Sequence, residues 1–222
     1  MPITYPTPKL VIFDCDGVLV DSETLSNQVL VDNLARHGLQ LSLAECMDLF
    51  VGGTMADVRT KAIARGADLP QDWIAEIYEE TYSRLRQGVD LVPGVSDLLA
   101  LLQARGIAFC VASNGSEEKM RITLGQNGLW DLFHPHAMFS AHTLKTGKPD
   151  PDLFLAAACH FDVQARDCLV IEDSENGAIA AARAGMRCLG FDPHGTGHRL
   201  TPHNAEHITT ITDVPRLIGL RP

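Results

Sequence analysis

The sequence predicts a doubly wound α/β core into which an all-helical domain is inserted, and three observations lead to this fold. Short apolar runs rich in β-branched residues recur along the chain, which is typical of buried strands. From residue 90 onwards these runs alternate with helical periodicity, whereas between residues 22 and 89 helical periodicity continues without a convincing strand. Alternating strands and helices imply right-handed crossovers and a parallel sheet covered on both faces. We therefore expect a Rossmann-like core formed by residues 1–21 and 90–222, and a helical cap domain formed by residues 22–89.

The predicted strands are apolar segments that end abruptly at polar residues. They occupy residues 9–13, 107–112, 138–139, 168–171 and 186–191. The segment from Pro193 to His207 is rich in histidine, glycine and proline, and we expect it to be a loop.

Helices are predicted where apolar residues recur every three or four positions. In the inserted domain they follow Ser22 and then occupy residues 44–50, 56–64 and 73–85, and in the core they occupy residues 94–105, 117–127, 151–160 and 175–184. Gly38 and Gly106 each end a helix, and Ser174 is placed to cap the helix that begins at Glu175. These helices separate the predicted strands, as a parallel sheet requires.

The overall charge and hydropathy limit the partners of the protein. The 222 residues carry a formal net charge of −10, and no basic run interleaved with aromatic residues offsets it, so a nucleic-acid partner is disfavoured. No stretch approaches the roughly 20 apolar residues that a membrane span needs, and residues 1–9 lack the apolar segment of a secretory signal. We therefore expect a cytoplasmic protein with no membrane partner, and a monomer because no exposed apolar stripe is evident.

The six cysteines are predicted to be buried free thiols. None of them forms a C-x-x-C pair, and several lie in apolar runs such as residues 107–112. Cys15 lies between two aspartates, but packing next to a strand explains this residue type better than catalysis does.

Polar side chains follow the predicted strands, and a parallel sheet gathers the carboxyl ends of its strands at one edge. Two carboxylates follow the first strand, a hydroxyl and an amide follow the second, and an acidic pair follows the strand at residues 168–171. A lysine lies in a turn before a helix and could face the same edge. In chain order these residues are Asp14, Asp16, Ser113, Asn114, Lys148, Glu172 and Asp173.

This set of side chains suits phosphate chemistry. Carboxylates alone would repel a phosphate dianion, so a divalent cation is needed, and Mg²⁺ fits because it takes one or two carboxylates together with phosphate oxygens. Asp14 and Asp173 are the natural ligands. Asp14 can also attack phosphorus to give an aspartyl-phosphate, and Asp16 is spaced to act as general acid and then general base. Ser113 and Lys148 can bind the phosphoryl oxygens and neutralise their charge.

Each feature also has a structural explanation that involves no chemistry. An Asp-x-Asp-Gly segment commonly forms a turn or a calcium loop, although Gly17 would also let the backbone turn out of the strand and place Asp16 beside the reacting centre. The acidic pair before Ser174 can stabilise a helix N-terminus, and Lys148-Pro149-Asp150 is typical of a solvated turn. A functional site is favoured because every feature falls just after a strand or at the same rim of the sheet.

Taken in order, four motifs resemble those of the haloacid dehalogenase (HAD) superfamily. They are FDCDGVLVDSE at residues 13–23, ASN at 112–114, GKPD at 147–150 and IEDSENG at 171–177. The helical domain between the first two resembles the branch that contains phosphoglycolate phosphatase, β-phosphoglucomutase and sugar-phosphate or 6-phosphogluconate phosphatases. The resemblance implies a magnesium-dependent phosphatase that hydrolyses a small phosphorylated metabolite, a sugar phosphate or a phospho-acid, through an aspartyl-phosphate.

The resemblance also implies how the metal is held. Asp14 would be both nucleophile and ligand, Asp16 would bind through its backbone carbonyl, and Asp173 through its carboxylate. Glu172 would bind Mg²⁺ directly or through water. Asp16 further distinguishes the chain from the dehalogenases of the superfamily, which lack this second aspartate.

For the substrate, the resemblance implies that Ser113 and Lys148 bind the transferring phosphoryl group, with Asn114 helping through its backbone. Two other functions remain open. A phosphosugar mutase needs an arginine beside the glycine loop of the cap, at residues 51–55, where this chain has Met55; Arg59, Arg84 or Arg86 could replace it. A non-catalytic binding module on the same scaffold is disfavoured because the motif residues are intact.

Overall fold

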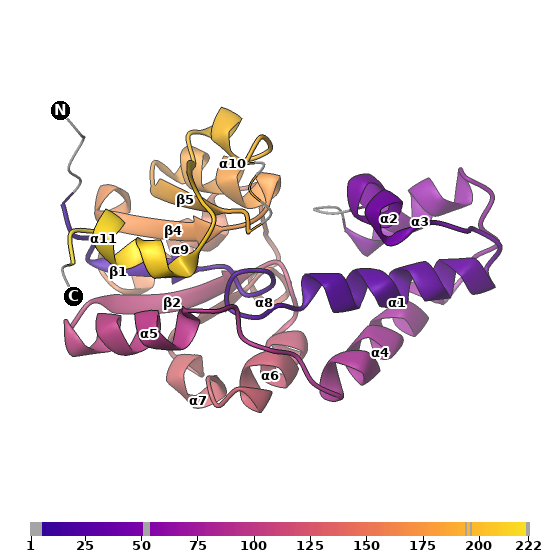
Figure 1. The fold of residues 1–222 in the computed structure, drawn as a ribbon, viewed down its shortest axis with the longest axis horizontal. Coiled ribbons are helices and arrows are strands. Elements are labelled where there is room, and N and C mark those ends of the chain that lie inside the picture. Colours follow the sequence, from indigo (N-terminus) through magenta and orange to yellow (C-terminus); the bar gives the residue numbers. More distant parts are fainter. Residues whose placement is uncertain (1–5, 51–53, 194, 196, 221–222) are drawn as a thin grey trace. The chain divides into compact units, whose positions relative to one another are not determined.

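In the computed structural model the chain is described at residues 6–50, 54–193, 195 and 197–220. It forms two compact units, one made of Met1–Val20 with Asp90–Pro222 and the other of Asp21–Val89. The first unit contains the sheet and is called the core unit, and the second is called the helical unit (Figure 1).

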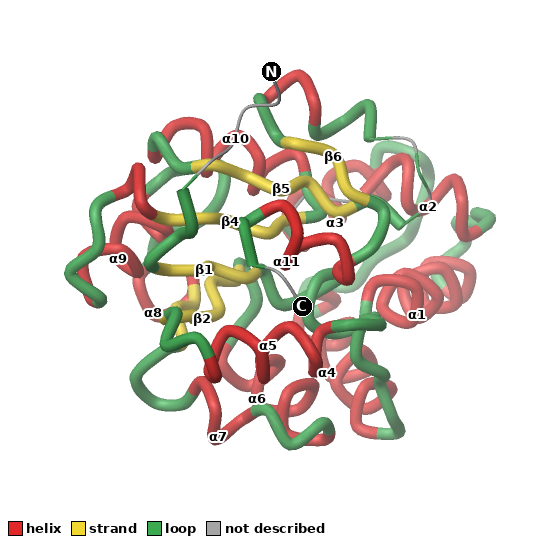
Figure 2. Tube along the Cα trace, turned by 60° about the vertical axis from the view of Figure 1, so that its left-hand side comes forward, coloured by secondary structure: helices red, strands yellow, loops and turns green. Residues whose placement is uncertain are grey.

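The sheet of the core unit contains six strands among the described residues, in the order β3-β2-β1-β4-β5-β6. Their bounds are β1 (Leu10–Phe13), β2 (Ala108–Ser113), β3 (Met138–Ser140), β4 (Cys168–Glu172), β5 (Arg187–Phe191) and β6 (Glu206–Ile208). All five pairings are parallel, and Figure 2 shows the strands side by side with α11 (Val214–Leu217) in front of them. The predicted doubly wound α/β fold is therefore confirmed.

The strand β1 lies at the centre of the sheet, and its register explains where the polar residues meet. Phe13, its last residue, pairs with Val111 of β2 and with Ile171 of β4. Every residue of β1 and β4 is buried, as expected for strands covered on both faces. The residues that follow Phe13, Ser113 and Ile171 are consequently brought to one edge of the sheet.

Helices between the strands bury the faces of the sheet. They are α5 (Val95–Ala104), α6 (Glu117–Gln126), α7 (Trp130–Phe133), α8 (Ala141–Leu144), α9 (Asp152–His160) and α10 (Glu175–Ala184). The helix α11 follows the last strand, β6, and 3₁₀ turns lie at Ala165–Asp167, Thr201–His203 and Ile211–Asp213. The helices α9 and α10 pack on one face in a cluster that includes Ile12, Phe154 and Ala181. Small alanines along α10 let this helix approach β4 and β5 closely.

The helical unit contains α1 (Glu23–Arg36), α2 (Leu43–Phe50), α3 (Met55–Ile63) and α4 (Trp73–Arg86), and its described residues include no strand. Its core is an apolar cluster that includes Leu34, Trp73 and Ile77. The buried Asn33 of α1 accepts a hydrogen bond of 2.7 Å from the indole nitrogen of Trp73, which ties α1 to α4. The buried amide is thus satisfied inside the apolar cluster.

Two sequence predictions differ from the structure. The segment 193–207 is not all loop, because it contains a 3₁₀ turn and the first residues of β6, an edge strand of three residues that pairs with β5. So short a strand leaves little periodicity to detect. In addition, Cys159 is exposed, whereas the five other cysteines are buried, and all six are free thiols.

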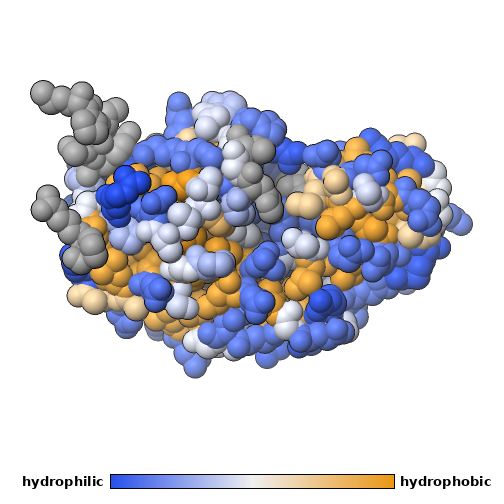
Figure 3. Space-filling model, in the orientation of Figure 1, coloured by the Kyte–Doolittle hydropathy of each residue, from blue (hydrophilic) through white to orange (hydrophobic). Residues whose placement is uncertain are grey.

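The surface of the core unit mixes apolar and hydrophilic residues in the view of Figure 3. Three large apolar side chains stand out as exposed among the described residues: Ile63, Leu144 and Leu155. No helix in the described part of the chain combines the length and the apolar character that a membrane span requires.

Candidate active site

The chain turns sharply after β1, and this turn carries the first two predicted site residues. Asp14 is 7% exposed, and its backbone N–H donates to the carbonyl of Ile171, which continues the sheet by one residue. Gly17 has a φ of +77°, and a Cβ on it would lie 1.9 Å from Oδ2 of Asp173. Glycine is therefore required both by the backbone conformation and by the carboxylate that occupies the space.

The end of β4 holds a second carboxylate in a fixed orientation. Glu172 is 1% exposed, and its Oε2 accepts hydrogen bonds from the backbone N–H and the hydroxyl of Ser174, at 2.7 and 2.8 Å. The hydroxyl oxygen of Ser174 also accepts from Gly177 N–H at 3.0 Å, which confirms Ser174 as the cap of α10. A Cβ on Gly177 would lie 1.9 Å from the carboxyl carbon of Glu172, so only glycine fits at this helical position.

Lys148 bridges the two strand ends. Its ammonium forms short ion pairs with Oδ1 of Asp14 and Oε1 of Glu172, and it lies 5.1 Å from the centre of the Phe154 ring. Burial raises the pKa of Asp14 to about 7, although the charge of Lys148 lowers it. For Lys148, burial lowers the pKa, but Asp14 and Glu172 outweigh it, so the pKa is raised and the ammonium stays charged.

The turn after β2 lies beside the same carboxylates. Ser113 is buried, and its hydroxyl oxygen accepts from Gly115 N–H at 2.9 Å. A Cβ on Gly115 would lie 3.2 Å from the Ser113 hydroxyl and 3.5 Å from Oδ2 of Asp16, so these two groups border the same small space. The hydroxyl of Ser140, at the end of β3, donates to the carbonyl of Gly115 at 2.7 Å and holds this turn in place.

Asn114 contacts the lysine turn through its side chain. Its Nδ2 donates to the carbonyl of Lys148 at 3.0 Å, and its Oδ1 accepts from the N–H of Lys148 at 2.9 Å. Sequence reasoning considered only the backbone of Asn114, so this side-chain contact was missed. It links the turn after β2 to the turn between α8 and α9.

Three acidic side chains could hold a metal ion. Oxygens of Asp14, Glu172 and Asp173 lie within 4.8 Å of one another. All three donors are carboxylate oxygens, the hard ligands that Mg²⁺ prefers. Their mutual repulsion also favours a cation at this point, beyond the single positive charge that Lys148 brings to Asp14 and Glu172.

Lys119 was not predicted as a site residue, yet its ammonium lies 2.9 Å from Oδ1 of Asp16. Burial lowers the pKa of Lys119, but the charge and hydrogen bond of Asp16 outweigh it, so the pKa is raised. One signal in the sequence could have identified this residue: a lysine in the first turn of a helix opposes the helix dipole, which suggests a nearby acidic partner.

The predicted site residues thus fall into connected groups. Lys148 contacts both Asp14 and Glu172, and a carboxylate oxygen of Asp173 lies within 4.8 Å of oxygens of both acidic residues. Of the other predicted residues, Asp16 lies in the turn after β1, Ser113 is the last residue of β2, and Asn114 follows Ser113 directly. In the helical unit, residues 51–53 of the glycine loop lie outside the described residues, and Met55 begins α3.

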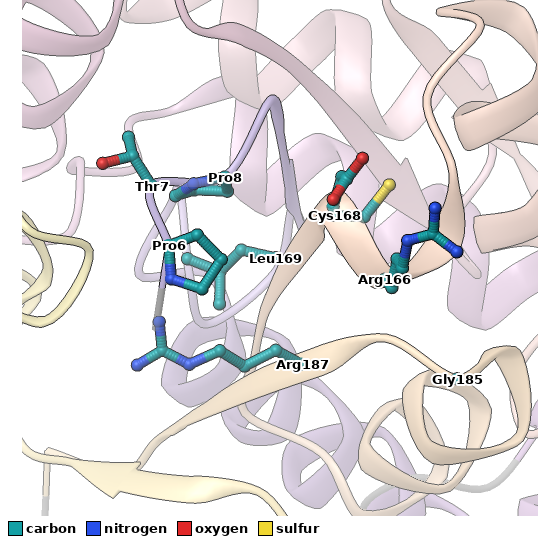
Figure 4. A pocket seen from close by; sticks show the side chains of 9 residues that line it. Pro6, Thr7, Pro8, Arg166, Cys168, Leu169, Gly185 and Arg187 are labelled. Atoms are coloured by element: carbon teal, nitrogen blue, oxygen red, sulfur yellow. The ribbon is translucent and has the colours of Figure 1, made fainter. Parts of the chain in front are cut away.

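A separate pocket lies at the opposite edge of the sheet, where β4 and β5 begin (Figure 4). Its lining includes Pro8, Cys168 and Arg187. The guanidinium of Arg187 already binds both carboxylate oxygens of Glu206, at 2.7 and 3.0 Å, so its charge is neutralised and we assign the pocket no ligand.

Comparison with known proteins agrees with this geometry. Residues 8–185 match the family model described as haloacid dehalogenase-like hydrolase. A 6-phosphogluconate phosphatase of Escherichia coli is 30% identical over 213 residues, which cover 94% of this chain and 92% of that protein. A relative named as a phosphatase supports the prediction of a phosphoric monoester hydrolase.

Two solved structures share the fold over almost their whole length. A haloacid dehalogenase-like protein from Agrobacterium tumefaciens has a TM-score of 0.85 and 33% identity, covering 95% of this chain and 97% of that one. A HAD family hydrolase from Deinococcus radiodurans, solved with bound phosphate and sodium, has a TM-score of 0.79 and 27% identity, with coverage of 97% and 99%. With four motifs in order and a family match over most of its length, the chain belongs to the haloacid dehalogenase-like hydrolases.

Proposed function

We propose that the protein is a magnesium-dependent phosphatase that hydrolyses a small phosphorylated metabolite, a sugar phosphate or a phospho-acid, through an aspartyl-phosphate at Asp14. One observation carries the proposal. Asp14 is buried at the carboxyl end of the central strand and contacts the Lys148 ammonium, and its carboxylate lies within 4.8 Å of carboxylate oxygens of Glu172 and Asp173. A nucleophile, a cation for the phosphoryl group and a metal-ligand set thus meet at one point.

The donor set fits Mg²⁺, because the cluster consists of three carboxylates, which supply hard oxygen ligands and not the sulfur or imidazole ligands of softer metals. We assign the ligands as Asp14, Asp173 and the backbone carbonyl of Asp16, with Glu172 binding directly or through water. When bound, the ion supplies positive charge that offsets the repulsion between the carboxylates and a phosphate dianion.

In the first step a carboxylate oxygen of Asp14 attacks phosphorus, and the bond from phosphorus to the ester oxygen breaks. Asp16 donates its proton to that leaving oxygen, so that the product departs as a neutral alcohol. Lys148 keeps its charge, because its pKa is raised, and it neutralises the negative charge on the phosphoryl oxygens. Ser113 donates its hydroxyl hydrogen to one of these oxygens.

In the second step Asp16, now ionised, takes a proton from water while the water oxygen attacks phosphorus. The bond from phosphorus to Asp14 breaks, the Asp14 carboxylate is regenerated and inorganic phosphate leaves. Asp16 thus regains in this step the proton that it gave up in the first one. The two aspartates therefore have different roles, which follow from their different surroundings: Asp14 is buried against Lys148, and the Asp16 side chain is 25% exposed.

The helical residues 22–89 act in this proposal as a cap domain that selects the substrate, inserted between the turn that carries Asp16 and strand β2. Support comes from their composition of four helices around a separate apolar cluster, in a segment that forms its own compact unit.

The test is phosphate release from a panel of phosphorylated sugars and phospho-acids, measured with Mg²⁺ and with a chelator. We expect metal-dependent release with one preferred class of substrate. Asp14→Asn keeps the shape of the residue but removes the nucleophile and a ligand charge, so turnover is expected to fall by at least about 10⁴-fold. Release that persists in Asp14→Asn would contradict the assigned nucleophile, and isomerisation of a hexose phosphate without release would indicate a mutase.

A further inference from the structure

Lys119 connects the turn after β2 to the carboxylate of Asp16. Its ammonium lies 2.9 Å from Oδ1 of Asp16, and the lysine and aspartate side chains are only 19% and 25% exposed. Solvent therefore screens this ion pair less than an exposed one, and the charge-assisted contact restricts the aspartate rotamer.

The backbone of Lys119 is itself held in place. Its N–H donates to the hydroxyl oxygen of Ser116, the cap of α6, at 3.1 Å, and its carbonyl accepts from the Thr123 hydroxyl at 3.1 Å. A Cβ on Gly115 would lie 3.6 Å from Cδ of Lys119, so the lysine side chain lies against the turn that follows β2. The backbone of Lys119 is thus fixed, and its side chain reaches Asp16 from this fixed position.

We propose that Lys119 is a positioning residue that holds the Asp16 carboxylate in the place from which it exchanges protons with the leaving group and with water. The inference rests on the proposed function. Proton transfer needs heavy atoms within hydrogen-bond reach, and the contact with Lys119 holds Oδ1 of Asp16, the residue that directly precedes Gly17 in the turn after β1. By this account Lys119 sets the rate of both chemical steps without binding substrate itself.

The chain offers a matched control. Lys9 and Asp167 form an ion pair of the same type and length, 2.9 Å, but the Lys9 side chain is 70% exposed. Lys9 precedes β1 and Asp167 precedes β4, so this pair lies at the opposite edge of the sheet from the site. Loss of Lys9 tests the effect of removing one lysine–aspartate pair without touching Asp16.

The experiment compares Lys119→Met, Lys119→Arg and Lys9→Met with the wild type, using the preferred substrate found in the phosphate-release panel. Because a misplacement of about 1 Å can cost about 100-fold in rate, we expect Lys119→Met to lower kcat by about 10- to 100-fold with KM changed by less than about twofold. Lys119→Arg, which keeps the charge, should recover a substantial part of the rate, and Lys9→Met should match the wild type.

A second kinetic measurement uses p-nitrophenyl phosphate, whose leaving group departs without help from an acid. In Lys119→Met the first release of p-nitrophenolate should stay close to the wild-type rate, whereas steady-state turnover should fall, because water attack still needs Asp16 as base. An increase in KM with kcat unchanged would overturn the proposal in favour of direct substrate binding. An unchanged kcat and KM would overturn it outright.

A crystal structure of Lys119→Met gives a readout that does not depend on activity. We expect the Asp16 carboxylate to move or to occupy more than one conformation, and an unmoved, single conformation would overturn the proposal. Should the wild type release no phosphate from any substrate, the proposed function would fail, while the position of Asp16 in the variant would still decide whether Lys119 holds it. Thermal unfolding of each variant checks that the fold is retained.

Discussion

The side-chain amide of Asn114 forms two hydrogen bonds with the backbone of Lys148, one as donor at 3.0 Å and one as acceptor at 2.9 Å. Thirty-four residues separate the two. The contact joins the turn after β2 to the turn between α8 and α9, and it fixes the backbone from which the Lys148 side chain reaches Asp14 and Glu172. Asn114 thereby holds the backbone that places the Lys148 ammonium between Asp14 and Glu172.

Asn114→Ala should therefore reduce both stability and activity. Losing two hydrogen bonds to partly buried backbone groups is expected to lower the free energy of unfolding by about 1–3 kcal/mol, and kcat should fall because the Lys148 turn is released. Chemical denaturation and steady-state kinetics measure the two effects. Asn127→Ala is the control, since the Asn127 amide donates to Thr123 within the same helical segment, at 2.9 Å and away from Lys148. Equal kinetic effects in both variants would argue against the role of Asn114.

A methyl group at Gly177 should disturb the site through Glu172. The added Cβ would lie 1.9 Å from the Glu172 carboxyl carbon, so the carboxylate must move and break its contacts with Lys148 or Ser174. We expect Gly177→Ala to lower the free energy of unfolding by about 1–3 kcal/mol and to weaken Mg²⁺ binding.

Gly125→Ala is the matched control, because Gly125 also lies in a helix but has open space where its Cβ would be. The same substitution there should be neutral or raise stability by up to about 1 kcal/mol, since alanine favours helix more than glycine does. Denaturant unfolding of the two variants measures the difference. Similar losses at both positions would contradict the close packing assigned to Gly177.

Metal affinity should depend on pH through Asp14. Burial raises the pKa of this carboxyl to about 7, so protons compete with the cation below that pH, and the ligand is ionised above it. The apparent affinity for Mg²⁺ is therefore expected to weaken as the pH falls through 7, by up to about tenfold per pH unit for a single competing proton. Calorimetric titration from about pH 8 to about pH 6 measures it. Asp14→Asn should remove this dependence, and an affinity that stays constant in the wild type would contradict the assignment.

Alkaline conditions should destabilise the fold through the buried thiols. Burial raises the pKa of Cys46 and of Cys168 to about 11, above the usual value of 9.0. The folded chain thus keeps protons that the unfolded chain releases, so this contribution to stability is complete below pH 9 and is lost as the pH rises towards 11. Each such thiol contributes a slope of up to about 1.4 kcal/mol per pH unit in that window.

Denaturant unfolding at several pH values between about 8 and about 10.5 measures this slope. Cys46→Ala should make the slope shallower, whereas Cys159→Ala should leave it unchanged because Cys159 is exposed. A slope that is the same in Cys46→Ala and in the wild type would exclude a contribution from this thiol.

Much of the candidate site could be predicted from the sequence, because its residues directly follow parallel strands that can be recognised by their apolar runs. The apolar runs at residues 10–13 and 168–171 show where buried strands end, and all carboxyl ends of a parallel sheet meet at one edge. Asp14 and Glu172 could therefore be predicted to lie close together, and in the structure both contact the ammonium of Lys148. The helix cap Ser174 is likewise a local feature, because a serine directly before the helical pattern that begins at Glu175 indicates a cap.

Only the tertiary structure decided which side chains touch. The contacts of Asn114 with Lys148, of Lys119 with Asp16 and of Glu172 with the space above Gly177 depend on how separate turns pack. The strand β6 also depends on tertiary structure, because its three residues form a strand by pairing with β5. Periodicity and capping are local, so a sequence expresses them directly. Pairing between distant segments depends on their relative placement in space, which one sequence leaves open until the chain is folded.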